Sequence, residues 1–210
     1  VASTATTANE VLFEYDDTVT AATLAAQQKF RAAITNLDNA VVDFTDFGKN
    51  EIKTWKQSPD AVVQLALMLS YSQLHPESAP PGVYEACSVS RFFHGRTETI
   101  RSLTEPAAAF IRAALDTINT NNSNDNNGNI ELRELMTAAT TEHRNNSIAA
   151  ASALGIDRHL LALQVVAESE GIQEPLFDEA LYSASQRWKL STSNVTADFI
   201  RYFAFGPVDQ

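Results

Sequence analysis

The chain has little cysteine, no long apolar run and few basic residues, and each shortage excludes a class of protein. Its one cysteine, Cys87, cannot form a disulfide within the chain, which excludes a disulfide-stapled secreted domain. No apolar run approaches the ~20 residues that a membrane-spanning helix needs. With 15 Lys and Arg against 26 Asp and Glu, the formal net charge is -11, which excludes a general binder of nucleic acid or anionic membrane. An anionic ligand must therefore be bound by a local basic cluster.

What remains is the composition of a soluble globular protein. Hydrophobic residues make up 44% and charged residues 20% of the 210 residues, which is enough to build a buried core. The chain begins at Val1 without an initiator Met or a signal-peptide pattern, and both ends read as arbitrary cuts. We therefore expect residues 1–210 to be one part of a longer protein from a reducing compartment.

Helix and strand signals together predict an α/β or α+β layered domain, with a mixed sheet covered by helices. Ser58-Pro59-Asp60 is a strong helix start, because Ser can cap the helix, Pro suits its first turn and Asp favours its dipole. The predicted helices cover about 20–44, 61–69, 104–118, 130–154, 157–168 and 178–188. The predicted strands cover 11–15, a strand–turn–strand over 83–102 broken at Gly95, 190–195 and 199–205. The helix over 61–69 has almost no polar face and is expected to be buried.

Residues 119–129 (N-T-N-N-S-N-D-N-N-G-N) form a polar, low-complexity segment. Such a segment cannot bury enough apolar surface to offset the entropy of ordering it. It predicts an exposed, mobile loop between two helices.

The first basic cluster is Lys49, Lys53 and Lys56, followed by Asp60. If this segment is helical, spacings of four and three put the ammonium groups on one side. Such a stripe can bind phosphates. The alternative is a solvated helix face, because exposed lysines are common.

The second basic cluster contains Arg91, His94, Arg96, Thr97 and Arg101. Arginine can bind a carboxylate through two parallel hydrogen bonds, and the alternative is an ion-paired structural strand. His94 and Glu98 have a helical spacing that could suggest a metal. Gly95 and the β-type context argue against a helix there, and two ligands make no closed site, so we predict no metal.

Two further groups could take part in chemistry. Arg158 precedes apolar residues that would anchor a helix start in a core, where an unpaired guanidinium is costly. It needs an anion, which could be Asp157, another protein carboxylate or a ligand carboxylate. Ser191 and Ser193 would face one side of an extended strand. A hydroxyl there could donate to an oxyanion in acyl transfer, although hydroxyl residues are ordinary in edge strands.

Several short motifs also follow one another in order along the chain. They are Phe47-Gly48-Lys49, Ser58-Pro59-Asp60-Ala61, Tyr84-Glu85-Ala86, Gly95-Arg96-Thr97 with Ile100-Arg101-Ser102, His143-Arg144, Asp157-Arg158-His159, Leu190-Ser191-Thr192-Ser193 and Phe205-Gly206-Pro207-Val208. This series resembles the choline/carnitine acyltransferase family from about Phe47 to Val208, and the Gly95 to Ser102 stretch is its most specific part.

The resemblance implies reversible transfer of an acyl group between coenzyme A and the hydroxyl of carnitine or choline. It also implies two domains resembling chloramphenicol acetyltransferase, of which this chain would hold one incompletely. Carried over by position, the residues that would contact coenzyme A are Lys49, Lys53 and Asp60. Those that would bind the carnitine carboxylate are Tyr84, Thr97 and Arg158. Ser193 would hydrogen-bond the oxyanion with support from Ser191, and Phe205 would lie near the trimethylammonium group.

Two residues indicate which substrates the resemblance favours. A cation at Arg158 suits carnitine, which has a carboxylate, whereas the choline enzymes that the chain resembles carry an uncharged residue there. Phe203 matches a position that is bulky in acetyl-transferring members and glycine in long-chain ones. We therefore expect carnitine and acetyl-CoA, or another short acyl-CoA, as substrates.

The chain departs from the family's pattern in three places. Ala86 stands where the family has Ser, and Asn194 stands where Gln is usual. The family's catalytic histidine, a general base, lies N-terminal to all of these motifs, and none of the 4 histidines matches it. We therefore expect the chain alone to be inactive and to need the N-terminal half of the same enzyme.

Two alternatives stay open at this point. The chain could be a non-catalytic module that binds coenzyme A and carnitine, or it could be a relative of the choline-acetylating enzymes. The resemblance implies an intracellular protein, with the mitochondrion or the peroxisome as the expected compartment.

Overall fold

The computed structural model of the chain describes residues 13–35, 37–38, 40–120 and 126–194. The chain divides into two compact units. The first contains Val1–Asp43 and Arg201–Gln210, and the second contains Phe44–Ile200. In the first unit the described residues form the helix α1 (Asp17–Thr35), none of whose residues is buried.

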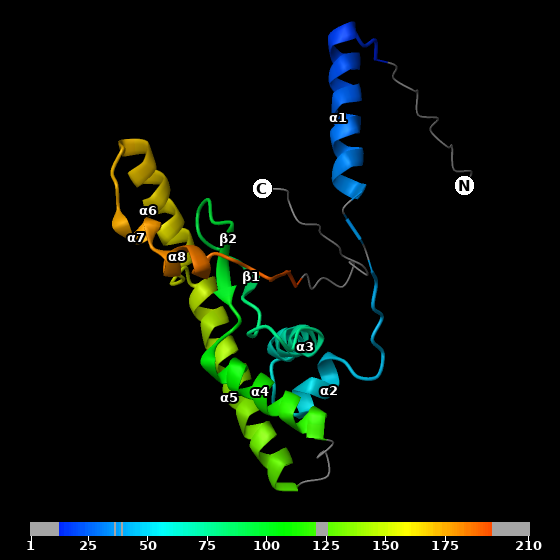
Figure 1. Cartoon of the computed structure of the whole chain (residues 1–210), viewed down its shortest axis with the longest axis vertical. Helices are drawn as coiled ribbons and strands as arrows, with labels where there is room; N and C mark the ends of the chain where they lie inside the picture. The colour runs from blue at the N-terminus through cyan, green and yellow to red at the C-terminus, as the bar shows by residue number, and fades with distance from the viewer. Residues whose placement is uncertain (1–12, 36, 39, 121–125, 195–210) are drawn as a thin grey trace, which may run out of the picture. The chain divides into compact units, whose positions relative to one another are not determined.

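The second unit combines helices with three short strands (Figure 1). In chain order, these are α2 (Lys49–Thr54), α3 (Pro59–Leu74), β1 (Val83–Ser88), β2 (Thr97–Arg101), α4 (Glu105–Thr120), α5 (Asn126–Ala151), α6 (Asp157–Glu170), α7 (Pro175–Asp178), α8 (Ala180–Ser185) and β3 (Leu190–Thr192). The long helix α5 runs beside α4 and the sheet, and α6 contacts β2. This arrangement confirms the predicted mixture of a mixed sheet with many helices.

β1 lies in the middle of the sheet, whose strand order is β2-β1-β3. It pairs antiparallel with β2, which sets Tyr84 opposite Arg101, and parallel with β3, which sets Tyr84 beside Ser191. Directly paired residues project to the same face of a sheet, so these three side chains form one row. The strand–turn–strand predicted over 83–102 is confirmed, and the strand predicted to begin at Leu190 is confirmed as β3.

The connection from β1 to β2 is a tight loop that needs Gly95. Val89 N donates to the Arg96 carbonyl at 3.1 Å, Phe92 N to the Val89 carbonyl at 3.0 Å and Gly95 N to the Phe92 carbonyl at 2.8 Å. A Cβ on Gly95 would lie 2.0 Å from the Val89 carbonyl oxygen. Glycine is therefore required by space, because no side chain fits against this backbone.

The core of the second unit lies between the sheet and helices α3, α4 and α5. Its buried apolar residues are Leu65, Met68, Val83, Ala107, Ile111 and Ala139. The predicted start of α3 is confirmed, because Ser58 Oγ accepts a hydrogen bond from Ala61 N and Pro59 is the first helical residue.

The prediction that the helix over 61–69 is buried is confirmed for one of its faces only. The buried residues of α3 are Ala61, Gln64, Leu65, Met68 and Ser72. On its other side Val63 and Leu67 are 52% and 42% exposed. The helix therefore packs through one face and leaves an apolar face uncovered within the described part of the chain.

The predicted helix over 20–44 is too long. α1 ends at Thr35, and the described residues beyond it form no helix in the first unit. Of the apolar stripe that suggested the longer helix, Ile34 is 44% exposed and Val41 is 83% exposed. Because α1 itself has no buried residue, packing does not explain where this helix ends, and the apolar stripe was a poor guide to its length.

Other boundaries also differ from the prediction. α4 continues to Thr120 and α5 begins at Asn126, so both ends of the predicted loop over 119–129 are wrong. The flanking helices extend into the polar segment because adding residues to an existing helix is far easier than starting one. The predicted helix over 178–188 is interrupted, since Glu179 is extended between α7 and α8. Phe13–Tyr15 form no strand, and the strand predicted over 199–205 lies outside the described residues.

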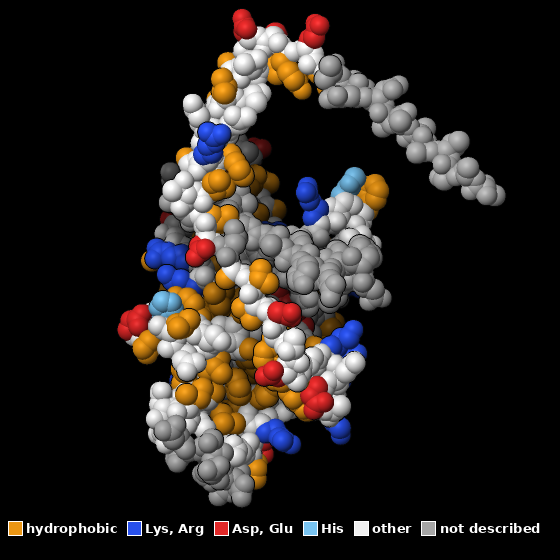
Figure 2. Space-filling view, turned by 90° about the vertical axis from the view of Figure 1, so that its right-hand side faces the viewer, with side chains coloured by type: hydrophobic (Ala, Val, Ile, Leu, Met, Phe, Trp, Pro, Cys, Tyr) orange, Lys and Arg blue, Asp and Glu red, His pale blue; other side chains and the backbone are white. Residues whose placement is uncertain are grey.

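The described surface carries many large apolar side chains. Phe93 is 92% exposed and Leu181 is 83% exposed, and Figure 2 shows orange hydrophobic side chains lying among charged ones. Among the described residues, every helix is too short or too polar to span a lipid bilayer.

Gly95→Ala should destabilise the chain, because the new Cβ would overlap the Val89 carbonyl oxygen. We expect the free energy of unfolding to fall by about 2 kcal/mol, measured by urea denaturation. Gly48→Ala is the matched control, because nothing lies within 4 Å of its added Cβ. An equal loss in both variants would contradict this account of the loop.

Candidate functional site

Arg158, at the start of α6, makes its side-chain hydrogen bonds to two residues of the sheet. Its Nη2 donates to the Tyr84 hydroxyl at 2.9 Å and to Thr97 Oγ1 at 3.2 Å, and its Nε donates to the Thr97 carbonyl at 3.0 Å. The structure therefore brings together the three residues that the resemblance assigns to the carnitine carboxylate. We call Tyr84, Thr97 and Arg158 the Arg158 cluster.

The Arg158 cluster keeps hydrogen-bond donors for a ligand. The hydroxyls of Tyr84 and Thr97 accept from Arg158, so each retains its own proton to donate. Within the described part of the chain no carboxylate pairs with Arg158, and Asp157 pairs with Arg101 instead, at 2.6 Å. A cation beside two hydroxyl donors is suited to an anion, and its planar guanidinium fits a carboxylate.

The backbone at Arg158 is held by a buried carboxylate of β2. Glu98, 4% exposed, accepts from Thr99 N at 2.7 Å and from Arg158 N at 3.3 Å through Oε1. A carboxylate is favourable at this place, because the first turn of a helix carries unpaired N–H groups and partial positive charge. A Cβ on Gly155 would lie 2.5 Å from Glu98 Cγ, so glycine lets the loop before α6 approach the sheet.

The serines of the predicted oxyanion site lie in and after β3. Ser191 is exposed and shares the row of Tyr84, and Ser193 is exposed just after the strand. Thr192 lies on the other face, where its Oγ1 donates to the Tyr84 carbonyl at 3.1 Å and accepts from Gln64 Nε2 at 3.0 Å. Within the described residues, neither serine hydroxyl makes a hydrogen bond, so both are available to a ligand.

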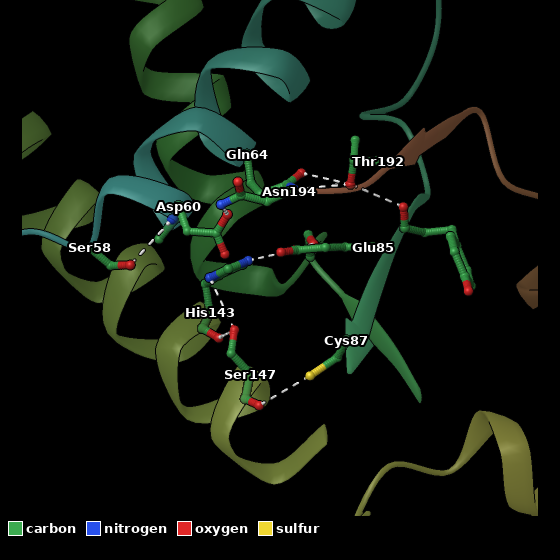
Figure 3. A network of polar contacts seen from close by, with 12 residues as sticks. Ser58, Asp60, Gln64, Glu85, Cys87, His143, Ser147, Thr192 and Asn194 are labelled. Atoms are coloured by element: carbon green, nitrogen blue, oxygen red, sulfur yellow. Dashed lines mark hydrogen bonds and ion pairs between the residues drawn. The ribbon is translucent and has the colours of Figure 1, made fainter. Parts of the chain in front are cut away.

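A second polar group, absent from the sequence-based predictions, lies in the core beneath the sheet (Figure 3). Glu85 Oε2 accepts a hydrogen bond from Ser102 Oγ at 2.6 Å and lies 2.7 Å from His143 Nε2. The side chains of His143 and Glu85 are only 5% and 2% exposed. We call Asp60, Glu85, Ser102 and His143 the buried network, since Asp60 approaches the same carboxylate from α3.

The buried network reaches the end of β3 through Asn194. Its Nδ2 donates to Asp60 Oδ1 at 2.9 Å, and Figure 3 shows this contact beside Gln64 and Thr192. Asn194 therefore joins the serine-bearing segment to α3.

The two carboxyl groups of the buried network have opposite pKa shifts. Burial, and then the charge of Glu85, raise the pKa of Asp60 above its usual range. Burial would also raise the pKa of Glu85, but the hydrogen bonds from His143 and Ser102 outweigh it and leave that pKa lowered. Glu85 is therefore the carboxylate that holds the charge, and Asp60 is the one that takes up a proton more readily.

The buried network also contains a group with the composition of a metal site. Single ligand atoms of Asp60, Glu85 and His143 all lie within 4.8 Å of one another. Glu85 Oε2 is already bound to both Ser102 and His143, and these bonds satisfy a buried carboxylate without an ion. We therefore interpret the group as a hydrogen-bonded network and identify no metal ligands in it.

The predicted coenzyme A residues are not joined to one another in the described part of the chain. Lys49 and Lys53 lie one turn apart on α2 and are exposed, which agrees with the predicted stripe. Lys56 lies beyond the end of α2 with a left-handed φ of 60°, so its predicted place on that helix is wrong. A polar pocket of about 430 Å³ lies between the α2–α3 connection and α5, lined by Lys56, Gln57, Ser58, Thr140, Thr141 and Arg144.

Some predicted residues cannot be placed, and others were not anticipated. Phe203 and Phe205 lie outside the described residues. Glu85 and His143 each occur in a family-like motif, but only burial distinguishes them from surface residues. The signal that could have found them is an acidic residue inside an otherwise apolar strand, since a buried charge needs a partner.

His143→Leu should destabilise the chain, because it leaves the charged Glu85 buried without its main partner. We expect a loss of about 3 kcal/mol in the free energy of unfolding, measured by urea denaturation. His159→Leu is the control, because His159 is exposed. The loss should shrink in a Glu85→Gln background, and an unchanged loss there would contradict the interpretation.

Asp60→Asn should stabilise the chain at neutral pH. The pKa of Asp60 is raised in the folded state, so the folded chain binds a proton more tightly than the unfolded chain, and stability falls as pH rises past the unfolded value of 3.8. Asparagine carries no charge at this position, so the variant does not lose this stability as the pH rises. Urea denaturation between pH 3 and pH 7 should show a gain that grows with pH, whereas Asp116→Asn, at an exposed position of α4, should show none.

Comparisons with known proteins show what the chain is similar to. The family model described as choline/carnitine O-acyltransferase matches residues 1–210. A choline O-acetyltransferase of Danio rerio is 35% identical over 185 residues, covering 88% of this chain and 28% of that protein. The mitochondrial carnitine O-palmitoyltransferase 2 of Xenopus tropicalis is 33% identical over 197 residues, covering 93% and 29%. The human form of the latter is 33% identical over 203 residues, covering 96% and 30%.

The match covers the whole chain but only part of each relative. The chain spans less than a third of the length of these curated relatives. Relatives named for choline and for carnitine have similar identities, so identity alone does not separate their substrates. By its full-length match and these identities, the chain belongs to the choline/carnitine O-acyltransferase family.

Proposed function

We propose that this chain is the C-terminal part of a longer enzyme that transfers an acetyl or other short acyl group between coenzyme A and the hydroxyl of carnitine. Membership of the family supports acyl transfer between a coenzyme A thioester and an alcohol. The observation that carries the choice of carnitine is the Arg158 cluster. Its guanidinium and two hydroxyls face no acidic partner among the described residues.

The choice between carnitine and choline depends on a carboxylate. Carnitine has one and choline has none, while both carry a trimethylammonium group. A guanidinium with two neighbouring hydroxyl donors would bind the carnitine carboxylate by charge-assisted hydrogen bonds. With choline, the same guanidinium would stay unpaired near a second cation.

Choline acetylation is the second candidate. It is favoured by the identity of 35% to a choline O-acetyltransferase. The charged residue at position 158 speaks against it, because the resemblance implies an uncharged residue there in choline enzymes.

For coenzyme A, we assign Lys49, Lys53 and Asp60. The two lysines offer exposed ammonium groups one turn apart on α2, suited to phosphate oxygens. Asp60 lies in the first turn of α3 and would contact the cosubstrate directly. Lys56 and Arg144 add positive charge to the pocket between the α2–α3 connection and α5. This local charge matters for binding an anion in a chain of net charge -11.

The proposed chemistry divides between this chain and the rest of the enzyme. The carnitine hydroxyl oxygen attacks the thioester carbonyl carbon while a general base takes the hydroxyl proton, and collapse of the oxyanion releases coenzyme A, whose thiolate takes up that proton. Ser193, supported by Ser191, would donate to the oxyanion. The base would come from outside this chain, because none of its histidines matches the family's position and His143 is buried against Glu85. The chain by itself is therefore expected to be inactive.

The acyl group, the complete fold and the compartment are the remaining parts of the proposal. A bulky Phe203 would fill the acyl pocket and favour acetyl over long chains, and Phe205 would lie near the trimethylammonium group. The sheet β2-β1-β3 would be part of a larger domain resembling chloramphenicol acetyltransferase. The mitochondrion or the peroxisome is the proposed compartment.

Arg158→Asn, made in the full-length protein that contains this chain, should move substrate preference from carnitine towards choline. The charge-assisted hydrogen bonds that the variant loses should contribute about 1.5–3 kcal/mol to the binding of carnitine. Their loss predicts a rise of about 10- to 100-fold in the KM for carnitine. Initial rates with each alcohol at saturating acetyl-CoA provide the measurement.

Arg133→Asn is the matched control, because Arg133 lies exposed on α5. This substitution removes the same charge at a position outside the Arg158 cluster. If the KM for carnitine is the same in both variants, Arg158 does not bind the carboxylate and the proposal fails.

A further inference from the structure

Arg101 lies at the end of β2 and uses its whole guanidinium in contacts with other elements. Its Nε and Nη2 donate to the two carboxylate oxygens of Asp157, at 3.0 and 2.6 Å. Its Nη1 donates to the Ser185 carbonyl at 3.0 Å, and its Cζ lies 4.7 Å from the centroid of the Trp188 ring. One side chain therefore joins the sheet to the start of α6 and to the segment that follows α8.

The contacts with Asp157 and Trp188 lead to members of the Arg158 cluster. Asp157 is the residue before Arg158, so the bidentate ion pair fixes the first turn of α6. Trp188 stacks edge-on with Tyr84, with ring centroids 5.9 Å apart, and Tyr84 is also the direct cross-strand partner of Arg101. Thr97 belongs to the same strand as Arg101.

We propose that Arg101 is a positioning residue that sets the Arg158 guanidinium and the Tyr84 hydroxyl for a substrate carboxylate. This inference rests on the proposed function of the Arg158 cluster. Arg101 does not touch the carboxylate itself, because its donors are directed to Asp157 and Ser185. It acts by fixing Asp157, and with it the first turn of α6 that carries Arg158, through two charge-assisted hydrogen bonds.

The geometry favours this role over that of an ordinary surface ion pair. The Asp157 side chain is only 8% exposed, so its charge is poorly screened and needs a fixed partner. Lysine cannot replace arginine here, because an ammonium lacks the planar fork and the stacking surface that bind carboxylate and ring together. Arg112 provides the contrast, since it meets Glu105 at 3.0 Å with side chains 58% and 84% exposed.

The test uses Arg101→Lys in the full-length protein, with Arg112→Lys as the matched control. We expect Arg101→Lys to raise the KM for carnitine about tenfold, while the KM for acetyl-CoA and the rate with choline change less than about twofold. Arg112→Lys should change none of these. In an Arg158→Gln background, Arg101→Lys should add no further rise, because both changes remove the same interaction.

Several outcomes overturn the inference. One is an unchanged KM for carnitine in Arg101→Lys while Arg158→Gln raises it, which leaves the proposed function intact. Another is an equal rise in both KM values, and a third is a fully additive effect in the double variant, since each indicates a general structural role. If Arg158→Gln itself has no effect, the proposed function fails and the inference fails with it. Should Arg101→Lys not fold, Asp157→Asn takes its place in the test. Asparagine keeps the side-chain shape and one acceptor oxygen, and the variant must show the same selective rise in the KM for carnitine.

Discussion

The ion pair between Arg101 and Asp157 is the interaction on which the candidate site depends. It joins β2 to the first turn of α6 across 56 residues of sequence, while Glu98 of the same strand accepts the Arg158 N–H. Asp157 and Glu98, with Arg101 and Arg158, therefore meet at the positively polarised start of α6. Because Asp157 is already paired, the guanidinium of Arg158 turns to the hydroxyls of Tyr84 and Thr97. Among the described residues, the site therefore combines an arginine paired with a carboxylate and an arginine that is not.

The buried network supports the opposite face of the same strand. Tyr84 faces the Arg158 cluster, and the next residue, Glu85, is buried against His143 and Ser102. A buried carboxylate is tolerated only when its partners are fixed, so α3, α5 and the residues after β2 must hold their places for the strand to keep its register. Asn194 extends this restraint to the serine-bearing end of β3 through Asp60. Of the proposed coenzyme A residues, Asp60 is thereby joined to the serine-bearing segment by a hydrogen bond.

Local sequence signals predicted the elements that local physics decides. The Ser58 cap, the hairpin broken at Gly95 and the strand starting at Leu190 depend on short-range rules and were confirmed. The helix expected to reach Phe44 ends at Thr35, although its apolar stripe continues beyond that residue. Motif order brought out Tyr84, Thr97 and Arg158, and the structure adds that they touch. Arg101, Glu85 and His143 occurred in family-like motifs without an assigned partner, since pairing between residues distant in sequence leaves no local pattern.

The central claim is that the unpaired guanidinium of Arg158 selects an alcohol that bears a carboxylate. The most direct measurement is the initial rate of the full-length protein that contains this chain, with carnitine and with choline as the alcohol, each offered acetyl-CoA or palmitoyl-CoA. The account predicts the highest kcat/KM for carnitine with acetyl-CoA. A higher kcat/KM for choline than for carnitine with either thioester would contradict it, because the Arg158 cluster would then not determine the choice of substrate.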